Sequence, residues 1–368
     1  MKFETNLQKL KEAVTLAEHI AGIHITLPVL SCILIEVKKN IAMLRATNLD
    51  VGMEILLSVK THEEGVVAIP AKTLSSFLSQ IPDQNHVVQL ELISGNIQII
   101  SAKTRGVIKT MPIEDFPSIP SIPDAEQFTL SSELFVKGLK SVCYSASISS
   151  VKPELSSVYV YKDAGNVTFV ATDSFRLAEK KIKINIPSQF NDILIPSKNV
   201  SEIIRTLEYI ASDVQVASNK NLISFKSGDI YIVSRVIDGV FPDYRQIIPK
   251  NFSTEAIVLK QDFLNALKVS NIFSDKFNQV HITVDPKGKV FEIQTKNVDV
   301  GENKTLVDAA LTGERVEINF NYKYIADSFQ SVDSDSVSLQ FTGLNRPMVV
   351  RPISGEQSFM YLVMPMNR

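Results

Sequence analysis

The chain is poor in cysteine, with only Cys32 and Cys143 among its 368 residues. Each lies in an apolar stretch, so we expect buried, reduced thiols and no disulfide. Apolar runs are short, and none approaches the roughly 18 residues of a membrane span. The first residues, MKFETNLQKL, also lack the apolar core of a signal peptide. These absences predict a cytoplasmic protein with no membrane partner.

Signatures of catalysis, nucleotide binding and metal binding are absent as well. The sequence has no G-x-S-x-G motif, no Walker phosphate loop and no metal-ligand spacing, and its five histidines form no cluster. We therefore expect no cofactor and no metal. An excess of one charge is also missing, because 38 Lys and Arg stand against 40 Asp and Glu. The net charge of −2 gives no overall indication of nucleic acid or of an anionic membrane.

What the chain does have is an internal repeat of about 125 residues. ATNLDVGMEI (46–55) resembles ATDSFRLAEK (171–180) and TKNVDVGENK (295–304). IPAK (69–72) returns as IPSK (195–198) and faintly as FNYK (320–323). DFPSIP (115–120) matches VFPDYRQIIP (240–249), and LVMPM (362–366) stands where a third such segment would end. Landmarks in one order at near-constant spacing predict three similar domains, 1–125, 126–250 and 251–368.

Each domain is predicted to hold two helices packed on an antiparallel sheet, an α+β arrangement. Apolar residues at i, i+3, i+4 and i+7 mark the first helix of each copy: Leu10, Ala13, Val14, Ala17; Phe135, Gly138, Leu139, Val142; Phe263, Ala266, Leu267, Ser270. The recurring Ala or Gly in second place suggests that two helices cross closely there. Pro70 and Pro196 suit the first turn of the second helix. Alternating stretches such as NVTFVAT and VFEIQT predict strands.

The segment FVATDSFRLA (169–178) has three possible interpretations: a catalytic turn, a hairpin, or the rim of a binding pocket. Thr172, Asp173 and Arg176 bring a hydroxyl, a carboxylate and a guanidinium together, which motivates the enzyme hypothesis. A turn-forming Asn or Asp recurs at this place in the other two copies, and no base completes a nucleophile pair. Turn chemistry is therefore favoured over catalysis.

Four segments, together with the repeat landmarks, carry a family resemblance: TLPVL (26–30), ATDSFRLA (171–178), DGVFPDYRQIIPK (238–250) and the terminal VMPM. Through them the whole chain resembles the β sliding clamp family of bacterial DNA polymerase III. The resemblance implies a non-catalytic processivity factor of the bacterial cytoplasm, with three tandem domains of the DNA clamp fold. Two chains would form a ring-shaped, head-to-tail homodimer around double-stranded DNA. The alternative is a three-domain structural scaffold that does not bind DNA.

The resemblance also implies partners that dock through short linear motifs. These are the DNA polymerase III catalytic subunit, the clamp loader and other replication and repair proteins. Because the sequence has no nucleotide site, loading onto DNA would require a separate ATP-driven machine.

A ring around DNA requires the helices that line it to be less acidic than the rest of the chain. The predicted helices are 6–22, 70–82, 134–148, 196–210, 260–276 and 321–331. Together they carry a net charge of +4, which leaves −6 for the remaining residues.

Lys72, Lys198 and Lys323 recur at the start of the second helix in the three copies, where a cation is unfavourable for the helix dipole. Their recurrence suggests a use, which the resemblance implies is phosphate contact; repeat ancestry alone would also preserve a solvated lysine. Arg205 on the same helix as Lys198 completes this set. The resemblance adds His24 and Lys152 as DNA-facing residues.

A hydrophobic cleft between the second and third domains, which binds peptides rich in Gln, Leu and Phe, is a further implication of the resemblance. Its residues here would be Leu155, Thr172, Ser174, Arg176, Leu177, Pro242 and Ile247 with Phe277, Asn321, Tyr324, Leu344, Leu362, Val363, Met364, Pro365 and Met366. Independently, the terminal LVMPMNR places two flexible methionines where several peptides could be accepted. The alternative is a terminal strand packed only into its own domain. Arg176 would hold a peptide carbonyl or carboxylate, while Phe175 and Gln246 depart from the family pattern.

The dimer interface implied by the resemblance joins the first domain of one chain to the third domain of the other. Lys103, Arg105 and Ile108 would meet Ile272, Phe273, Asp299 and Glu302 of the partner subunit. A basic side facing an acidic side fixes the orientation of such a contact. Gly106 stands where relatives commonly place an apolar side chain, so we expect a weakened interface.

Overall fold

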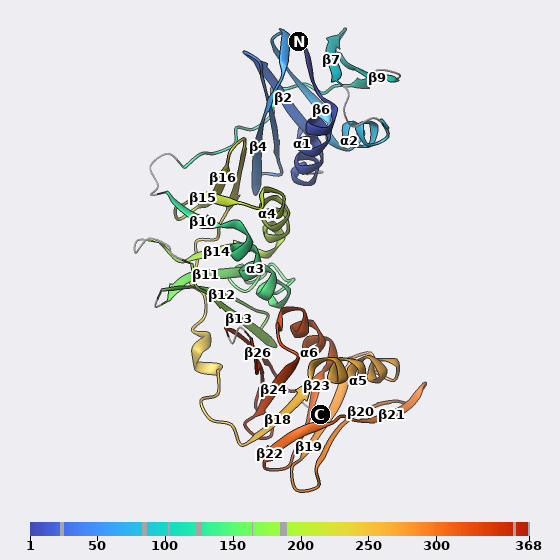
Figure 1. The fold of residues 1–368 in the computed structure, drawn as a ribbon, viewed down its shortest axis with the longest axis vertical. Helices are drawn as coiled ribbons and strands as arrows, with labels where there is room; N and C mark the ends of the chain where they lie inside the picture. The colour runs from blue at the N-terminus through green and yellow to red at the C-terminus, as the bar shows by residue number, and fades with distance from the viewer. Residues whose placement is uncertain are drawn as a thin grey trace. The chain divides into compact units, whose positions relative to one another are not determined.

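The structure, a computed structural model, describes residues 1–22, 26–82, 87–101, 104–122, 127–163, 165–184, 190–355 and 358–366. One order of elements occurs three times in them: a strand, a helix, four strands, a second helix and three strands (Figure 1). Copies one and three each add a short strand, β5 (Lys60–Glu63) and β22 (Ala309–Gly313), which pairs with the first strand of its copy. The prediction of repeated α+β units with two helices each is confirmed.

The bounds of the elements follow the repeat. The first copy contains β1 (Lys2–Asn6), α1 (Leu7–Ile20), η1 (Pro28–Ser31), β2 (Cys32–Lys38), β3 (Ile41–Thr47), β4 (Val51–Ser58), β6 (Gly65–Pro70), α2 (Ala71–Ser79), β7 (Val87–Ile93), β8 (Asn96–Ser101) and β9 (Thr104–Lys109). The second contains β10 (Phe128–Ser131), α3 (Ser132–Val142), η2 (Cys143–Ser145), β11 (Ser157–Asp163), β12 (Asn166–Thr172), β13 (Arg176–Ile182), β14 (Ile193–Pro196), α4 (Ser197–Ile210), β15 (Asp213–Ser218), β16 (Leu222–Ser227) and β17 (Ile230–Arg235), followed by η3 (Tyr244–Ile247). The third contains β18 (Thr254–Leu259), α5 (Lys260–Ile272), β19 (Gln279–Asp285), β20 (Val290–Asn297), β21 (Gly301–Leu306), β23 (Val316–Asn321), α6 (Tyr322–Ser328), η4 (Phe329–Ser331), β24 (Ser336–Phe341), β25 (Met348–Pro352) and β26 (Phe359–Val363).

The chain folds into two compact units, and the second copy is divided between them. The first unit holds a sheet of order β5-β1-β7-β8-β9 and one of order β10-β15-β16-β17-β4-β3-β2-β6. The second unit holds sheets of order β14-β11-β12-β13-β26-β25-β24-β18-β22 and β21-β20-β19-β23. Every pairing described between these strands is antiparallel, for instance β11 with β12.

Two pairings join strands from different copies of the repeat. In the first unit the last strand of copy two, β17, pairs with β4 of copy one, with Gly52 opposite Val233. In the second unit the last strand of copy three, β26, pairs with β13 of copy two, with Leu177 opposite Leu362. The same rule operates both times: the last strand of one copy completes a sheet on the third strand after the first helix of the copy before it.

The helices bury the faces that the sequence predicts. In α5 the buried residues are Phe263, Ala266, Leu267 and Ser270, which are the four predicted ones. Pro70 stands at the N-cap of α2 and Pro196 ends β14, so both prolines lie just before the helix and not within its first turn.

The small residue predicted to mark a helix crossing has a different role in α3. A Cβ on Gly138 would lie 2.3 Å from Cε2 of Phe169, which belongs to strand β12. The close neighbour at this position is therefore the sheet and not a second helix.

Both cysteines are free; Cys32 is buried and Cys143 partly so. Burial raises the pKa of both thiols, which keeps them protonated at neutral pH. Among the described residues no helix is long and apolar enough to cross a membrane.

Replacing Gly138 with Ala should destabilise the second unit, because the new methyl group displaces the Phe169 ring. The gain in helix propensity is about 1 kcal/mol and overpacking costs about 1–3 kcal/mol, so we expect a net loss. Gly239→Ala is the matched control, since its Cβ would come no closer than 3.5 Å to Leu194. Urea unfolding of both variants measures the difference; a more stable Gly138→Ala protein would contradict it.

Candidate functional site

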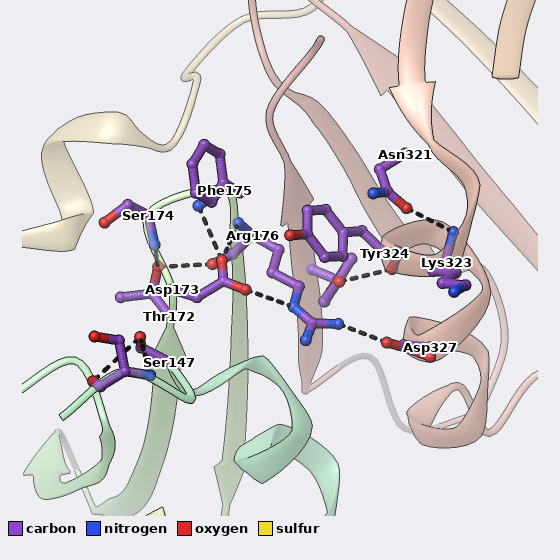
Figure 2. Close-up of polar contacts among 12 residues, drawn as sticks. Ser147, Thr172, Asp173, Ser174, Phe175, Arg176, Asn321, Lys323, Tyr324 and Asp327 are labelled. Carbon is purple, nitrogen blue, oxygen red and sulfur yellow. Dashed lines mark hydrogen bonds and ion pairs between the residues drawn. The ribbon is translucent and has the colours of Figure 1, made fainter. Parts of the chain in front are cut away.

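The turn between β12 and β13 is held by its own polar side chains (Figure 2). Thr172 Oγ1 donates to the carbonyl oxygen of Arg176 over 2.6 Å, and Asp173 Oδ1 accepts from the backbone N–H of Phe175 and of Arg176. Ser174 adopts a left-handed φ of 77°. The Thr172 hydroxyl and one Asp173 oxygen are thus engaged in shaping the turn. This arrangement is the turn chemistry that the sequence favoured.

The first copy repeats this turn almost bond for bond. Thr47 Oγ1 donates to the carbonyl oxygen of Val51 over 2.8 Å, and Leu49 has a φ of 74°. Asn48 Oδ1 accepts from the backbone N–H of Asp50 and of Val51, as Asp173 does in the second copy. The recurrence shows that the motif is structural in both copies.

Arg176 distinguishes the second copy, and its side chain is only 10% exposed. Its Nε donates to Asp173 Oδ2 over 3.0 Å and its Nη1 to Asp327 Oδ2 over 2.6 Å (Figure 2). The guanidinium also lies 4.6 Å from the ring centroid of Tyr324 in α6. Two carboxylates therefore pair with the guanidinium and connect it to the turn and to α6.

The C-terminal segment is hydrogen-bonded to this turn and to strand β23. Beyond β26, the backbone N–H of Met364 donates to the carbonyl oxygen of Phe175 over 2.8 Å. Two residues later, the N–H of Met366 donates to the carbonyl oxygen of Asn319 over 2.8 Å. In β26 itself, the hydroxyl of Tyr361 donates to the carbonyl oxygen of Tyr324, and burial raises the pKa of this phenol so that it remains a neutral donor.

An apolar cluster lies under the turn and the C-terminal segment. It contains the predicted residues Leu177 and Leu362, both fully buried, and Met364 packs against it. Phe241 and Tyr244, from the segment that follows β17 at the end of the second copy, belong to the same cluster. The structure thus brings together predicted residues from β13, β26 and the chain terminus.

The other predicted cleft residues differ in exposure. Leu155, Thr172 and Val363 are buried, whereas Asn321, Tyr324, Pro365 and Met366 are partly exposed. Ser174, Pro242, Ile247, Phe277 and Leu344 are exposed. Asn321 caps α6 by accepting from the N–H of Lys323, and its Nδ2 donates to the carbonyl oxygen of Phe277.

Several neighbours of this cluster were not indicated by the sequence. The Tyr159 ring stacks on Tyr161 at 4.8 Å and on Phe241 at 4.9 Å. The hydroxyls of Tyr161 and Tyr244 lie 2.7 Å apart, and Tyr244 also donates to Glu179. Alternation in SSVYVYK places Tyr159 and Tyr161 on one face of β11, and this was the available signal. No local pattern pointed to Asp327, which lies 151 residues from its partner Arg176.

The predicted DNA-facing cations divide into two groups. Lys72, Lys152 and Lys323 are exposed, and within the described residues none forms an ion pair. Lys198 Nζ lies 2.6 Å from Asp50 Oδ2, and Arg205 Nη1 lies 2.9 Å from Glu202 Oε2. His24 lies outside the described residues.

The predicted interface residues lie on two edge strands and on the end of a helix. Arg105 is exposed on β9, where Ile108 is buried within its own unit at 6% exposure. Asp299 and Glu302 are exposed at β21, next to Ile272 at the end of α5, which is 66% exposed. Phe273 is partly exposed, and Lys103 lies outside the described residues.

Three family models match consecutive parts of the sequence. They are the N-terminal domain of the DNA polymerase III beta subunit over residues 1–120, its central domain over 129–243 and its C-terminal domain over 245–367.

Curated relatives match over the full length. The beta sliding clamp of Synechococcus elongatus is 25% identical over 374 residues, which cover 100% of this chain and 99% of the relative. That of Proteus mirabilis is 28% identical over 373 residues and covers all of both chains.

Solved structures share the fold. The DNA polymerase III subunit beta from Pseudomonas aeruginosa superposes with a TM-score of 0.93 at 23% identity, covering 100% of both chains. The beta chain from Streptococcus pneumoniae gives 0.94 at 23% identity, again with full coverage of both.

Removing the Arg176 side chain should destabilise the second unit, because Asp173 keeps a carboxylate that is only 14% exposed without its partner. We expect Arg176→Ala to lower the free energy of unfolding by about 2–3 kcal/mol, less than the cost of breaking a fully buried pair. Arg205→Ala removes an exposed pair and should cost below about 0.5 kcal/mol. Chemical unfolding measures both, and equal losses would refute the structural role of Arg176.

Proposed function

We propose that two chains close head to tail into a ring around duplex DNA, because the chain belongs to the DNA polymerase III beta subunit family. The sliding clamps of this family give processivity to DNA synthesis without catalysing it. The three domains of each chain are 1–125, 126–250 and 251–368. The ring holds DNA by enclosing it, so its grip is independent of sequence.

The pairing rule of the sheets carries this proposal. Within the chain, β17 completes a sheet on β4 and β26 completes one on β13. The last strand of the first copy, β9, and the corresponding third strand of the last copy, β21, each end a sheet among the described residues. Continuing the rule pairs β9 of one chain with β21 of another. Such a contact is heterologous, and made twice it closes a ring.

Charge and apolar surface at the two edges fit this pairing. Arg105 on β9 is exposed, and Asp299 and Glu302 are exposed at the other edge. Opposite charges at the two sides select the head-to-tail orientation. Val107 on β9 and Leu306 on β21 are exposed apolar side chains, and an exposed apolar edge strand favours pairing with another chain.

Phosphate contact inside the ring falls mainly to Lys72, Lys152 and Lys323. They are exposed cations that form no ion pair with any residue the structure describes, so they can meet the DNA backbone without leaving such a partner. Lys198 and Arg205 would first have to leave Asp50 and Glu202. Together with His24, these residues supply a weak, salt-sensitive attraction that leaves the ring free to slide.

Partner peptides dock over the buried side chains of Leu177 and Leu362, where the partly exposed Met364 offers apolar surface. The exposed side chains of Pro242, Ile247 and Leu344 form the rim, and Phe175 adds bulk at the turn. The peptides belong to the DNA polymerase III catalytic subunit, the clamp loader and other replication and repair proteins of the bacterial cytoplasm.

Retention on closed circular DNA tests the ring. After loading, we expect the protein to stay on a closed circle through gel filtration and to leave within minutes when the circle is cut once. Addition of about 0.5 M salt should weaken phosphate contacts but leave the loaded protein on the uncut circle. Equal loss from cut and uncut circles would reject enclosure and support a scaffold that does not hold DNA.

Peptide binding tests the docking surface. A peptide of the Gln-Leu-Phe type should bind the full-length protein, and deletion of residues 364–368 should abolish binding, because Met364 and its hydrogen bond to Phe175 are lost. Deletion of residues 367–368 alone is the control and should leave binding intact. Isothermal titration measures all three proteins. Undiminished binding to the 364–368 deletion would exclude this surface.

A further inference from the structure

Gly106 lies in the edge strand β9, and the ring of Phe77 from α2 occupies the space of a side chain at position 106. A Cβ built on Gly106 would lie 2.5 Å from Cε2 and 2.5 Å from Cζ of Phe77. Gly106 is not among the described glycines with positive φ. The neighbouring ring, and not the backbone conformation, is therefore what excludes a side chain there.

Phe77 lies at the edge of the sheet and is partly exposed to solvent, whereas the other apolar residues on its face of α2 are buried. Ala71, Leu74 and Leu78 of α2 are buried, whereas Phe77 is partly exposed. Gly106 pairs with Ile99, which is fully buried, so the Phe77 ring lies on the sheet face that the helix covers. An aromatic surface thus borders the open side of β9.

The opposite edge also has a glycine beside a phenylalanine, for a different reason. Gly301 of β21 has a φ of 130°, which favours glycine, and a Cβ there would lie in ordinary contact, 3.8 Å from Cδ1 and Cε1 of Phe273, the C-cap residue of α5. Gly301 pairs with Asn297, whose Nδ2 donates to the carbonyl oxygen of Ser274, so this glycine also lies on the helix-covered face. Each edge strand therefore carries a glycine beside a phenylalanine that a helix supplies.

We propose that Phe77 replaces the missing side chain at position 106 and packs against the partner's Phe273 in the ring. The pairing rests on the proposed closure of β9 on β21, which would bring the two helix-covered faces into one continuous face. Ile272 of the partner subunit, exposed in the single chain, extends the contact. The apolar anchor of this interface thus comes from helix α2 and not from the edge strand.

This assignment reverses the expectation that Gly106 weakens the interface. A ring of Phe77 restores apolar area beside β9, and aromatic residues at the centre of an interface are frequent hot spots. An aromatic pair also constrains orientation, because offset and edge-to-face geometries are preferred. Phe77 thus supplies the apolar side chain that residue 106 lacks, and the contribution of that side chain to the interface is retained.

An exchange of the two positions tests the proposal. We would compare the wild type, Phe77→Ala, Gly106→Phe and the double variant Phe77→Ala/Gly106→Phe by light scattering over a dilution series. Phe77→Ala should weaken each contact about tenfold, and the dimer Kd about 100-fold because the ring contains the contact twice. Gly106→Phe alone should lower the thermal midpoint, since two rings compete for one space. The double variant should recover a Kd within about tenfold of wild type, because the phenyl group is then supplied by residue 106 of the strand.

The outcomes separate this proposal from the ring itself. A wild-type chain that remains a 40.9 kDa monomer overturns the ring and the pairing together. A dimeric wild type that Phe77→Ala leaves unchanged within threefold overturns only the pairing. Ile41→Ala, an exposed residue of β3 away from both edges, is the control and should not alter the Kd. If Phe77→Ala unfolds, Phe273→Ala probes the same contact from the other edge, and an unchanged Kd there also overturns it.

Discussion

The fold depends on main-chain hydrogen bonding between copies of the repeat. Where β17 meets β4 and β26 meets β13, the end of one copy satisfies the backbone groups that another would leave open. A strand edge with open backbone groups is a template for further pairing. A chain that joins its own repeats in this way keeps two such edges, on β9 and β21, that can pair with another chain. The open strands β9 and β21 follow from the number of copies in the chain, because three copies provide two internal joins.

The second join also positions the surface that we propose for peptide docking. Pairing of Leu177 with Leu362 brings the 172–176 turn beside the C-terminal segment, and the hydrogen bond from Met364 to Phe175 fixes that segment. Arg176 connects the turn to α6 through Asp327 and Tyr324. Residues far apart in the sequence are thus connected, and the arginine makes contacts on both sides.

The sequence was informative where physical constraints are local or periodic. The buried face of α5 and the turn at Thr172 were predictable, because helical spacing and turn-forming side chains leave a direct trace. The contacts of Arg176 with Asp327 and of Gly138 with Phe169 were not, since each depends on packing between distant segments. Gly106 is the clearest example: the sequence shows a missing side chain, and only the structure shows the ring beside it. Burial of Ile108 was equally invisible, because Val107 and Ile108 are adjacent apolar residues of β9 and the sequence does not show which of them faces inward.

The pairing of Leu177 with Leu362 has an evolutionary consequence. These side chains lie beneath the proposed docking surface and also form the seam between two copies, so truncating either to alanine would cost about 2–5 kcal/mol of folding free energy. We therefore expect this surface to vary at exposed positions such as Phe175 and Leu344, which contribute little to folding. Lineages can retune which partners they prefer by changing the rim, while the buried side chains stay fixed. An inhibitor that bound over these buried side chains and avoided the rim would leave the protein few substitutions by which to escape it.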